Sequence, residues 1–470
     1  SEDVELKDIK LSGTLRNGHK SDKALLNIKN IKAGFNTEVF QGAIFLQNFE
    51  NPDLKVDLQG SIDVGVIGKL FTVPGWNAEK GTLSGEFRIE GNLAQIEENP
   101  SNGVLIGALK LNDITLKDQG SGKLISELNG EILLDGKDLN IPELKGKSGQ
   151  GEEWLIKGKS ENLYNYIFGK NQTLKIKGDF ASNLLIIDSW LGKDDSDEKT
   201  ENNSAGVGIP SGVELDLKIE IDEVRWAKFI GKKIIGNAFV SKDFVKVENL
   251  KMNAMEGEFV LQAKAYINSK NEYVVNANLK TKGLEISKLF YECNNFGQNE
   301  ITDKNLTGKL QSEIQFASVW DKNFEVDAKR MYVFAKLKIE KGQLKNYEPL
   351  KSLSKFIKVS ELENIQFATL ENEIEIRDEK IFIPTMELKN NALNLFVEGV
   401  HSFENRVEYH LKIKLSELIS AKYKKQKNLD EFEDDPQNQK ALNLFVLMKG
   451  LIDDLKITYD GKAARNKVKE

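Results

Sequence analysis

Hydrophobic and polar residues alternate with a period of two along much of the chain. Residues 405–415 read NRVEYHLKIKL. Every second residue of this stretch is large and apolar, namely Val407, Tyr409, Leu411, Ile413 and Leu415. This period is that of a half-buried β-strand. Because leaving one large apolar side chain in water costs about 1.5–3 kcal/mol, the apolar side of such a strand needs a cover.

Similar stretches recur, among them LKVDLQGSIDV, GEFRIEGN and VELDLKIEIDEV. The pairs Asn17-Gly18, Asn129-Gly130 and Asp135-Gly136 are typical of tight hairpins. A strand-plus-turn spacing of about 8–12 residues predicts roughly two dozen strands. Candidate helices are few and short: Val66–Phe71, Leu184–Leu191, Ile286–Glu292, Pro349–Val359 and Ser416–Tyr423. The pattern therefore predicts a mainly β fold.

Four segments share a longer plan, in which an asparagine-led turn precedes an alternating strand and then a short apolar helix. They begin at Asn51, Asn171, Asn271 and Asn405. Their unequal spacing is too long for a tight solenoid and suits modules of several strands, each closed by a small helix. Chance similarity among amphipathic hairpins is the alternative explanation.

Residues 193–206, KDDSDEKTENNSAG, lack apolar periodicity. Such a composition cannot bury enough surface to become ordered, so we expect a flexible linker or loop that can be shortened without loss of stability. It divides the chain into β-rich groove modules at 1–192 and a C-terminal β-groove region at 207–470. A second polar stretch at 422–440 is interpreted as a solvated loop.

Charge and length exclude several classes of protein. Acidic residues outnumber basic ones by 73 to 66, so no basic excess exists to neutralise phosphates and we expect no nucleic acid partner. No run of 18 apolar residues predicts a membrane span. The chain begins SEDVEL, and we expect an upstream anchor to be absent from it. A single cysteine, Cys293, excludes an internal disulfide.

Residues suited to catalysis or metal binding are sparse. Cys293 completes no metal motif, and the GKS tripeptides at 146–148 and 158–160 lack the earlier glycine of a phosphate-binding loop. Three histidines have no partner at a metal-binding spacing: His19, His401 and His410. We therefore expect no enzymatic activity, no catalytic residue, no metal and no cofactor.

The last 130 residues carry the most specific pattern. KLKIEKGQLKNYEPLKSLSKFI predicts a strand, a turn and an amphipathic helix, whose apolar face consists of Leu350, Leu353, Phe356 and Ile357. We expect this helix to pack on the sheet or to plug one end of it.

A hairpin is expected after this helix. Ile374 and Ile376 should pair across the RDEK turn with Ile381 and Ile383. Pro384 then interrupts the ladder. The alternation resumes at Leu393, Leu395 and Val397.

This C-terminal region resembles that of the AsmA family, in the form found in Bacteroidetes-like sequences. The matching pieces are GQL…PL…LSKFI, IFIPTMELKNNALNLFVEGVHSFENRVEYHL and the final LFVLMKGLIDDLKITYD. The resemblance covers 207–470 well and the first 190 residues only in style. AsmA-like proteins, which are related to TamB, look like periplasmic bridge-like lipid transfer proteins.

The resemblance implies a periplasmic protein held in the inner membrane by an N-terminal helix that this chain lacks. It also implies a long, bent antiparallel sheet with a hydrophobic inner groove, which carries phospholipid or another envelope lipid towards the outer membrane. An outer-membrane protein is then a candidate partner.

Two arrangements satisfy the alternation. A sheet of more than about ten strands can curl into an open gutter whose apolar side is covered by lipid tails. Alternatively, facing strands cover one another in a sandwich or barrel. We expect the open gutter, with a groove lined in part by Leu393, Leu395, Val397, Val407, Tyr409, Leu411, Ile413 and Leu415.

The expected function is a lipid-binding conduit between the two membranes. The alternative is a structural or assembly module of the envelope that binds protein partners through exposed strand edges. A carbohydrate-binding β protein is a third class, but the clustered aromatic residues and carboxylates typical of that class are not evident in the sequence.

Overall fold

The strands of the protein form one open sheet. In the computed structural model, 24 strands belong to it, and the accompanying helices are short. The structure describes residues 6–466 except for 17–19, 36–37, 66–75, 99–101, 120–121, 137, 150, 163–165, 167–172, 191–211, 300, 322–323, 349–362, 392–393, 415–442 and 453. The predicted fold class is confirmed: the chain is mainly β, and its sheet does not close.

The chain divides into two compact units. Unit 1 comprises Ser1–Arg225 with Lys233–Val247, and unit 2 comprises Trp226–Lys232 with Glu248–Glu470. The division therefore falls within β12 (Phe229–Ser241) and β13 (Phe244–Ala254). The expected boundary at 193–206 lies between β10 and β11, two paired strands that both belong to unit 1 up to Arg225.

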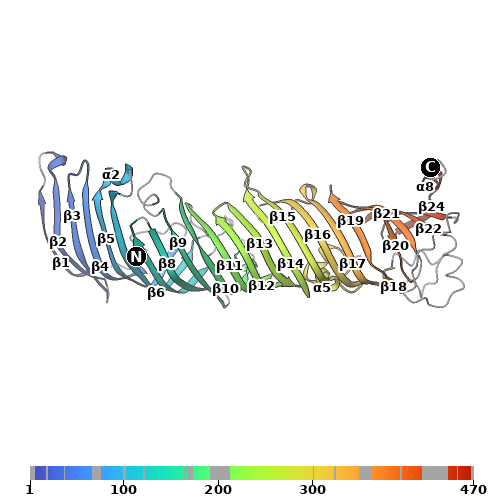
Figure 1. Ribbon diagram of the computed structural model, residues 1–470, viewed down its shortest axis with the longest axis horizontal. Helices are drawn as coiled ribbons and strands as arrows, with labels where there is room; N and C mark the ends of the chain where they lie inside the picture. Colours follow the sequence, from blue (N-terminus) through green and yellow to red (C-terminus); the bar gives the residue numbers. More distant parts are fainter. Residues whose placement is uncertain are drawn as a thin grey trace. The chain divides into compact units, whose positions relative to one another are not determined.

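Unit 1 is a run of strands in which each pairs with the next along the chain, as Figure 1 shows in blue to green. Its strands are β1 (Leu6–Arg16), β2 (Leu25–Phe35), β3 (Glu38–Gln47), β4 (Asp53–Asp63), β5 (Trp76–Asn92), β6 (Val104–Asp118), β7 (Leu124–Asp135), β8 (Asp138–Ser148), β9 (Glu152–Ser160), β10 (Leu174–Ile186) and β11 (Val213–Trp226). The short helices α2 (Leu93–Glu98) and α4 (Ile187–Trp190) follow β5 and β10.

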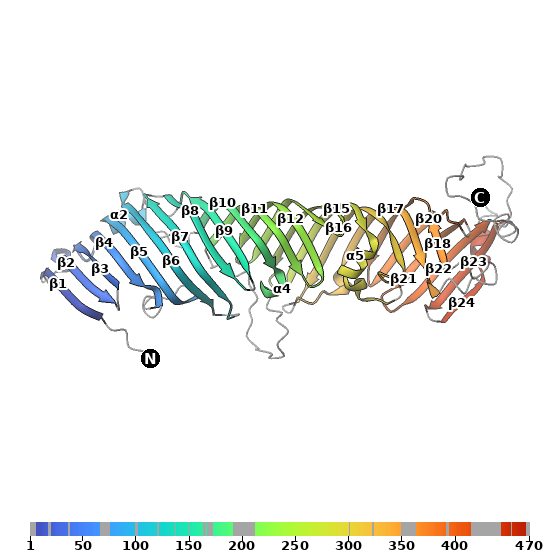
Figure 2. The same cartoon turned by 90° about the horizontal axis from the view of Figure 1, so that it is seen from below.

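In unit 2, strands that follow one another along the chain are again paired in most cases. Its strands are β14 (Gly257–Ile267), β15 (Tyr273–Glu285), β16 (Leu306–Trp320), β17 (Tyr332–Lys345), β18 (Asn364–Phe367), β19 (Leu370–Arg377), β20 (Lys380–Leu388), β21 (Leu395–Ser402), β22 (Arg406–Lys414), β23 (Asn443–Leu451) and β24 (Asp454–Tyr459). β17 pairs with both β18 and β19. Helix α5 (Ile286–Glu292) lies against β15 and β16 (Figure 2), and α8 (Gly461–Asn466) follows β24.

The pair of β10 and β11 departs from the expected antiparallel order. β10 and β11 are parallel, in register from Leu174 beside Val213 to Ile186 beside Arg225. The expectation of a wholly antiparallel sheet is therefore wrong at this point. Alternation specifies which side of a strand is apolar, but it is the same for either direction of the neighbouring strand.

Local predictions were confirmed in part. Asp135-Gly136 forms the turn between β7 and β8, with Gly136 at φ +60°. Asn129-Gly130 does not form a turn: it lies inside β7, at a register shift against β8 that begins after Ser126. A β-bulge inserts an unpaired residue at such a point, and turn-forming residues tolerate its backbone.

The helix predictions had mixed outcomes. The helix at Ile286–Glu292 is confirmed as α5, whereas the helix expected at Leu184–Leu191 is wrong in its first part, where β10 continues to Ile186. The strand-then-helix order of the repeat is present at β10–α4 and β15–α5. Three expected helices lie wholly outside the described residues: Val66–Phe71, Pro349–Val359 and Ser416–Tyr423.

Candidate functional site

The largest candidate site is one face of the sheet in unit 2. A row of directly opposed residues crosses β14 to β24, leaving out only β18. It consists of Ala263, Ala277, Phe316, Val333, Ile376, Ile381, His401, Val407, Gly450 and Leu455. We call these ten residues the apolar row. Nine steps between strands of about 4.8 Å give it a length of about 43 Å.

The next residues along the strands face the other way and are chemically different. Their row runs through Gln262, Asn278, Gln315, Phe334, Glu375, Phe382, Val400, Glu408, Lys449 and Lys456. Seven of these ten side chains are polar or charged, against one in the apolar row. Unit 2 therefore has an apolar face and a charged face, as the alternation predicted.

Ion pairs between opposed residues stabilise the charged face. Lys280 contacts Glu313 at 2.9 Å and Lys336 contacts Glu373 at 3.0 Å, and both pairs are in direct register. In unit 1, Lys55 and Glu90 are opposed in the same way at 2.9 Å. Such pairs contribute roughly 0.2–1 kcal/mol each, so their main effect is to disfavour a slip in register.

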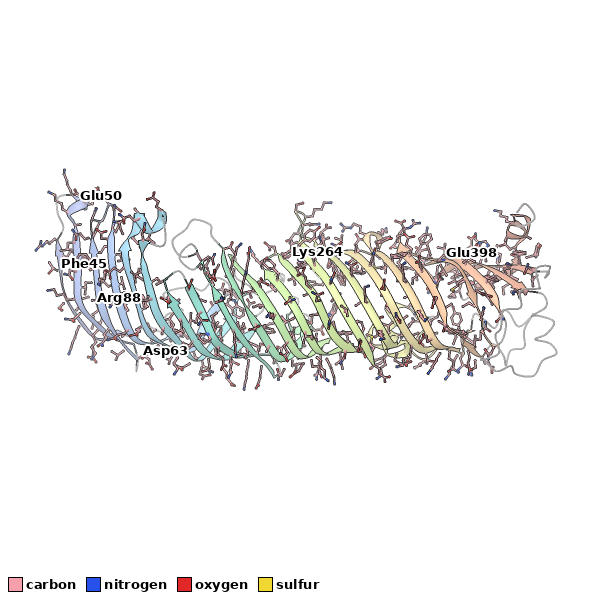
Figure 3. The ribbon with its side chains drawn as sticks, in the orientation of Figure 1. Phe45, Glu50, Asp63, Arg88, Lys264 and Glu398 are labelled. Atoms are coloured by element: carbon pink, nitrogen blue, oxygen red, sulfur yellow. The ribbon has the colours of Figure 1, made fainter. Side chains whose placement is uncertain are left out.

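Unit 1 has the same two faces. Ile28, Ile44, Val56, Ile89 and Leu105 form an aliphatic row across β2 to β6. The opposite side carries ion pairs such as that of Arg88 with Asp57. Figure 3 marks Arg88 on unit 1 and Lys264 on unit 2, which both belong to the charged faces.

Glycines on the apolar face lie directly beneath large side chains. A Cβ on Gly342 would lie 2.0 Å from the Phe367 ring, and one on Gly146 would lie 2.4 Å from the Trp154 ring. Any side chain at these positions would displace the ring. The aromatic residue thus packs against backbone, and glycine in a strand permits this close approach.

The apolar face of unit 2 is covered at two places within the described residues. At α5, a buried cluster contains Phe259, Leu284, Ile286 and Leu310. Near the C-terminal strands, a second cluster contains the five residues Val397, Leu411, Ile413, Val446 and Met448. Between them, Ala277, Phe316 and Val333 remain partly exposed. We call these three residues the open section of the apolar row.

The residues expected to line the groove fall into three groups. Val407, Leu411, Val397 and Ile413 lie on the apolar face, but they are buried, Ile413 completely. Leu395 and Tyr409 lie on the same face and are partly exposed. The others lie outside the described residues: Leu393, Leu415, Leu350, Leu353, Phe356 and Ile357.

Sequence reasoning missed the open part of the apolar face. Ala277, Phe316 and Val333 were not selected, although EYVVNANLKTKGL was recognised as an alternating strand. The signal was present, because the period of two is as clear in β15 and β16 as in β22. The open section differs from the buried clusters in the exposure of its side chains. That exposure is set by neighbouring strands and cannot be read from the alternation of residues.

The polar groups in the apolar face are uncharged near neutral pH. The hydroxyl of Tyr409 lies 3.2 Å from Nδ1 of His401. Burial lowers the pKa of His401 and raises the pKa of Tyr409 to about 12. Both groups are therefore neutral at pH 7, and the apolar row carries no charge there.

His410 belongs to the charged face, as expected. Its Nδ1 lies 2.5 Å from Oδ2 of Asp460, a residue that is only 4% exposed. The other carboxylate oxygen of Asp460 accepts a hydrogen bond from the backbone N–H of Ala463 in α8 at 3.1 Å. The pair thus connects β22 to the start of α8 and has a structural role.

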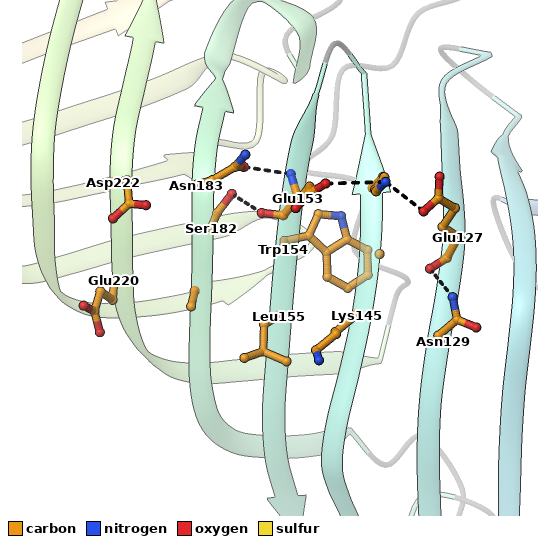
Figure 4. A pocket seen from close by; sticks show the side chains of 13 residues that line it. Glu127, Asn129, Lys145, Glu153, Trp154, Leu155, Ser182, Asn183, Glu220 and Asp222 are labelled. Atoms are coloured by element: carbon orange, nitrogen blue, oxygen red, sulfur yellow. Dashed lines mark hydrogen bonds and ion pairs between the residues drawn. The ribbon is translucent and has the colours of Figure 1, made fainter.

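A pocket of about 610 Å³ lies over β7 to β11 in unit 1 (Figure 4). Its lining residues are mainly polar, and Lys147 forms ion pairs there with Glu127 at 2.8 Å and Glu153 at 3.4 Å. Lys147 donates hydrogen bonds to these two carboxylates, and this raises the pKa of Lys147. A lysine held in its protonated form is neither a base nor a nucleophile.

The described part of the chain contains no cluster of three or more His, Cys, Asp or Glu residues that could hold a metal ion. Within the same residues, no helix combines the length and the apolar character needed to cross a membrane. Neither a protein-family model, nor a curated protein, nor a solved structure matches this chain.

Proposed function

We propose that the protein binds the acyl chains of phospholipid on its apolar face and conducts lipid along it between the inner and outer membranes. The apolar row supports the proposal, because it crosses ten strands of unit 2 without a charge at neutral pH. The two membranes and the periplasm come from the resemblance to the AsmA family.

Lipid tails fit this face energetically and in size. Moving an acyl chain into water costs about 0.8 kcal/mol per CH₂, or on the order of 12 kcal/mol for a 16-carbon tail. A bilayer core two tails thick measures about 30 Å, so one tail is shorter than the row of about 43 Å. An apolar surface of this length lowers the barrier to transfer, and it requires no nucleotide site because it sets no direction.

The test compares two neighbouring residues on opposite faces. Phe316 is in the open section of the apolar row, and Gln315 is an exposed residue of the charged face. Phe316→Asp and Gln315→Asp add the same charge one residue apart. Each variant would be purified as the full chain, checked by circular-dichroism melting and extracted with organic solvent for mass spectrometry of bound phospholipid.

We expect both variants to fold, because neither residue belongs to a buried cluster. Phe316→Asp should lose more than half of the bound phospholipid and most of the transfer between donor and acceptor vesicles, whereas Gln315→Asp should retain both. A folded Phe316→Asp protein with its full complement of phospholipid would contradict the proposed lipid path.

A second candidate function, docking of a protein partner at a strand edge, is supported by β1. This strand pairs only with β2 among the described residues, and Ile9, Leu11 and Leu15 are 56%, 61% and 67% exposed. An exposed apolar edge is a template for an added strand. Two results together would favour this function. The wild-type protein would contain no phospholipid, and it would bind a protein partner tightly while Leu11→Pro would not bind that partner.

A further inference from the structure

A group of large apolar side chains is exposed at one set of strand ends in unit 2. Trp226 is 46% exposed, Ile230 42%, Tyr291 54% and Phe296 58%. Trp226 and Ile230 flank the turn between β11 and β12, and the other two belong to α5 and the turn after it. We call these four residues the aromatic edge.

Contacts between the two segments make them one surface. The Nζ of Lys228 lies 5.0 Å from the centre of the Tyr291 ring and 3.1 Å from Oδ1 of Asn294. The backbone N–H of Ile230 donates a hydrogen bond to Oε2 of Glu292 at 3.3 Å. Burial raises the pKa of Glu292.

A strained turn holds Phe296 in its exposed position. Asn294, Asn295 and Phe296 have consecutive φ values of 50°, 52° and 55°. Left-handed backbone costs roughly 1–2 kcal/mol per residue, and asparagine tolerates it better than a bulky residue does. The ring centres of Phe296 and Phe290 lie 5.2 Å apart with the two rings nearly perpendicular, and Phe290 packs on the cluster of Ile286.

The size and chemistry of the aromatic edge favour a lipid surface over a protein. Three aromatic rings and one isoleucine, each about half exposed, present on the order of 400 Å². A stable protein interface needs about 800 Å² from each partner. Tryptophan and tyrosine with a nearby lysine are instead the residues that concentrate at the boundary between lipid headgroups and acyl chains.

We propose that the aromatic edge docks unit 2 onto the surface of a lipid bilayer, with the rings at the headgroup–acyl boundary and Lys228 at a lipid phosphate. This docking is separate from the proposed conduit, since a protein with no lipid on its apolar face would still bind a bilayer through this edge. It adds a partner surface that the apolar row does not provide.

The opposite strand ends supply a matched control. There, Arg330 binds Glu272 through two nitrogens, at 3.1 and 2.8 Å, and also contacts Asp327 at 2.6 Å. Tyr332 and Phe403 are exposed at these ends, by 41% and 42%. A double variant of this tyrosine and phenylalanine removes the same chemistry as a double variant of Tyr291 and Phe296.

The experiment measures co-sedimentation of the full chain with vesicles of equal parts phosphatidylethanolamine and phosphatidylglycerol. The edge variant is Tyr291→Gln with Phe296→Asn, in which asparagine suits the left-handed backbone. The control is Tyr332→Thr with Phe403→Asn. We expect the edge variant to bind vesicles at least tenfold more weakly and the control to bind like the wild type. Both should keep the phospholipid that copurifies with the wild type.

A second readout does not depend on the edge variant folding. Brominated lipid should quench part of the tryptophan fluorescence of the wild type, and this part should be absent in Trp226→Phe.

Three outcomes would overturn the proposal. The wild type could fail to bind vesicles, or the edge variant and the control could lose vesicle binding equally. In the third outcome, the edge variant binds vesicles like the wild type but loses a dimer that the wild type forms in sedimentation velocity. The last would assign the edge to a second copy of the chain. A wild-type protein that binds vesicles but contains no copurified phospholipid would count against the conduit and not against the aromatic edge.

Discussion

Shortening the connection between β10 and β11 tests the parallel pairing of these two strands. The chain leaves β10 at Ile186, passes through α4 and must return to Val213, which lies beside Leu174. The distance from Ile186 back to Leu174 is 12 residues of strand, or about 40 Å at about 3.3 Å per residue. The connection at 191–211 has 21 residues, enough to reach about 70 Å when extended.

Deleting Asp195–Ser204 leaves 11 residues in this connection. Fully extended, they reach about 36–40 Å, no more than the distance they must cover. We therefore expect the deletion to pull residues out of the β10–β11 ladder. Loss of two ladder hydrogen bonds at about 1 kcal/mol each would lower the melting temperature by roughly 4–8 °C for a unit of this size. The sequence alone led to the opposite expectation, that shortening is harmless.

Circular-dichroism melting of a length series would measure this effect. Deleting only Asp195–Glu198 leaves 17 residues with a reach of about 56–61 Å, so its melting temperature should equal that of the wild type. Replacing Asp195–Ser204 by ten glycine and serine residues should also be neutral, because length and not composition matters here. An unchanged melting temperature for the ten-residue deletion would refute the parallel pairing over the full length of β10.

Two further predictions concern buried side chains. Leu411→Asp places a carboxylate in the cluster of Val397, Ile413, Val446 and Met448. It should lower the free energy of unfolding by more than about 4 kcal/mol, so that circular-dichroism melting shows an unfolded unit 2. Lys412→Asp removes a cation 4.7 Å from the centre of the Phe396 ring and should lower that free energy by about 1 kcal/mol or less. Equal melting of the two variants would contradict the burial of Leu411. Burial and the charge of Glu292 raise the pKa of Cys293 to about 11 from 9.0, so the neutral thiol dominates at pH 8 and alkylation by iodoacetamide should be about 100-fold slower than for a free thiol. Alkylation at the rate of free cysteine would refute this protected environment.

The alternation of residues along the chain was enough to assign the two faces of the sheet and much of the local pairing. The period of two in NRVEYHLKIKL correctly assigned Val407, Leu411 and Ile413 to one face, because adjacent side chains of a strand point to opposite sides whatever its neighbours are. Ile376 pairs with Ile381 as expected, and the ladder between β20 and β21 shifts register between Ile383 and Met386, next to Pro384. These features depend on residues a few positions apart.

Tertiary structure decided everything that depends on which strands become neighbours. Leu411 and Phe316 occur in equally clear alternating strands, yet the first is buried in a cluster and the second is partly exposed. The cluster around Leu411 gathers side chains from β21, β22 and β23, and this gathering is decided by contacts between strands. The parallel direction of β11 was likewise not encoded locally, since either direction satisfies the same apolar face. The aromatic edge combines residues near 228 and 292, and their proximity arises only when β12 and α5 pack together. A pattern along the chain specifies which side of a strand is apolar. The exposure of a side chain and the identity of the neighbouring strand follow from contacts between strands.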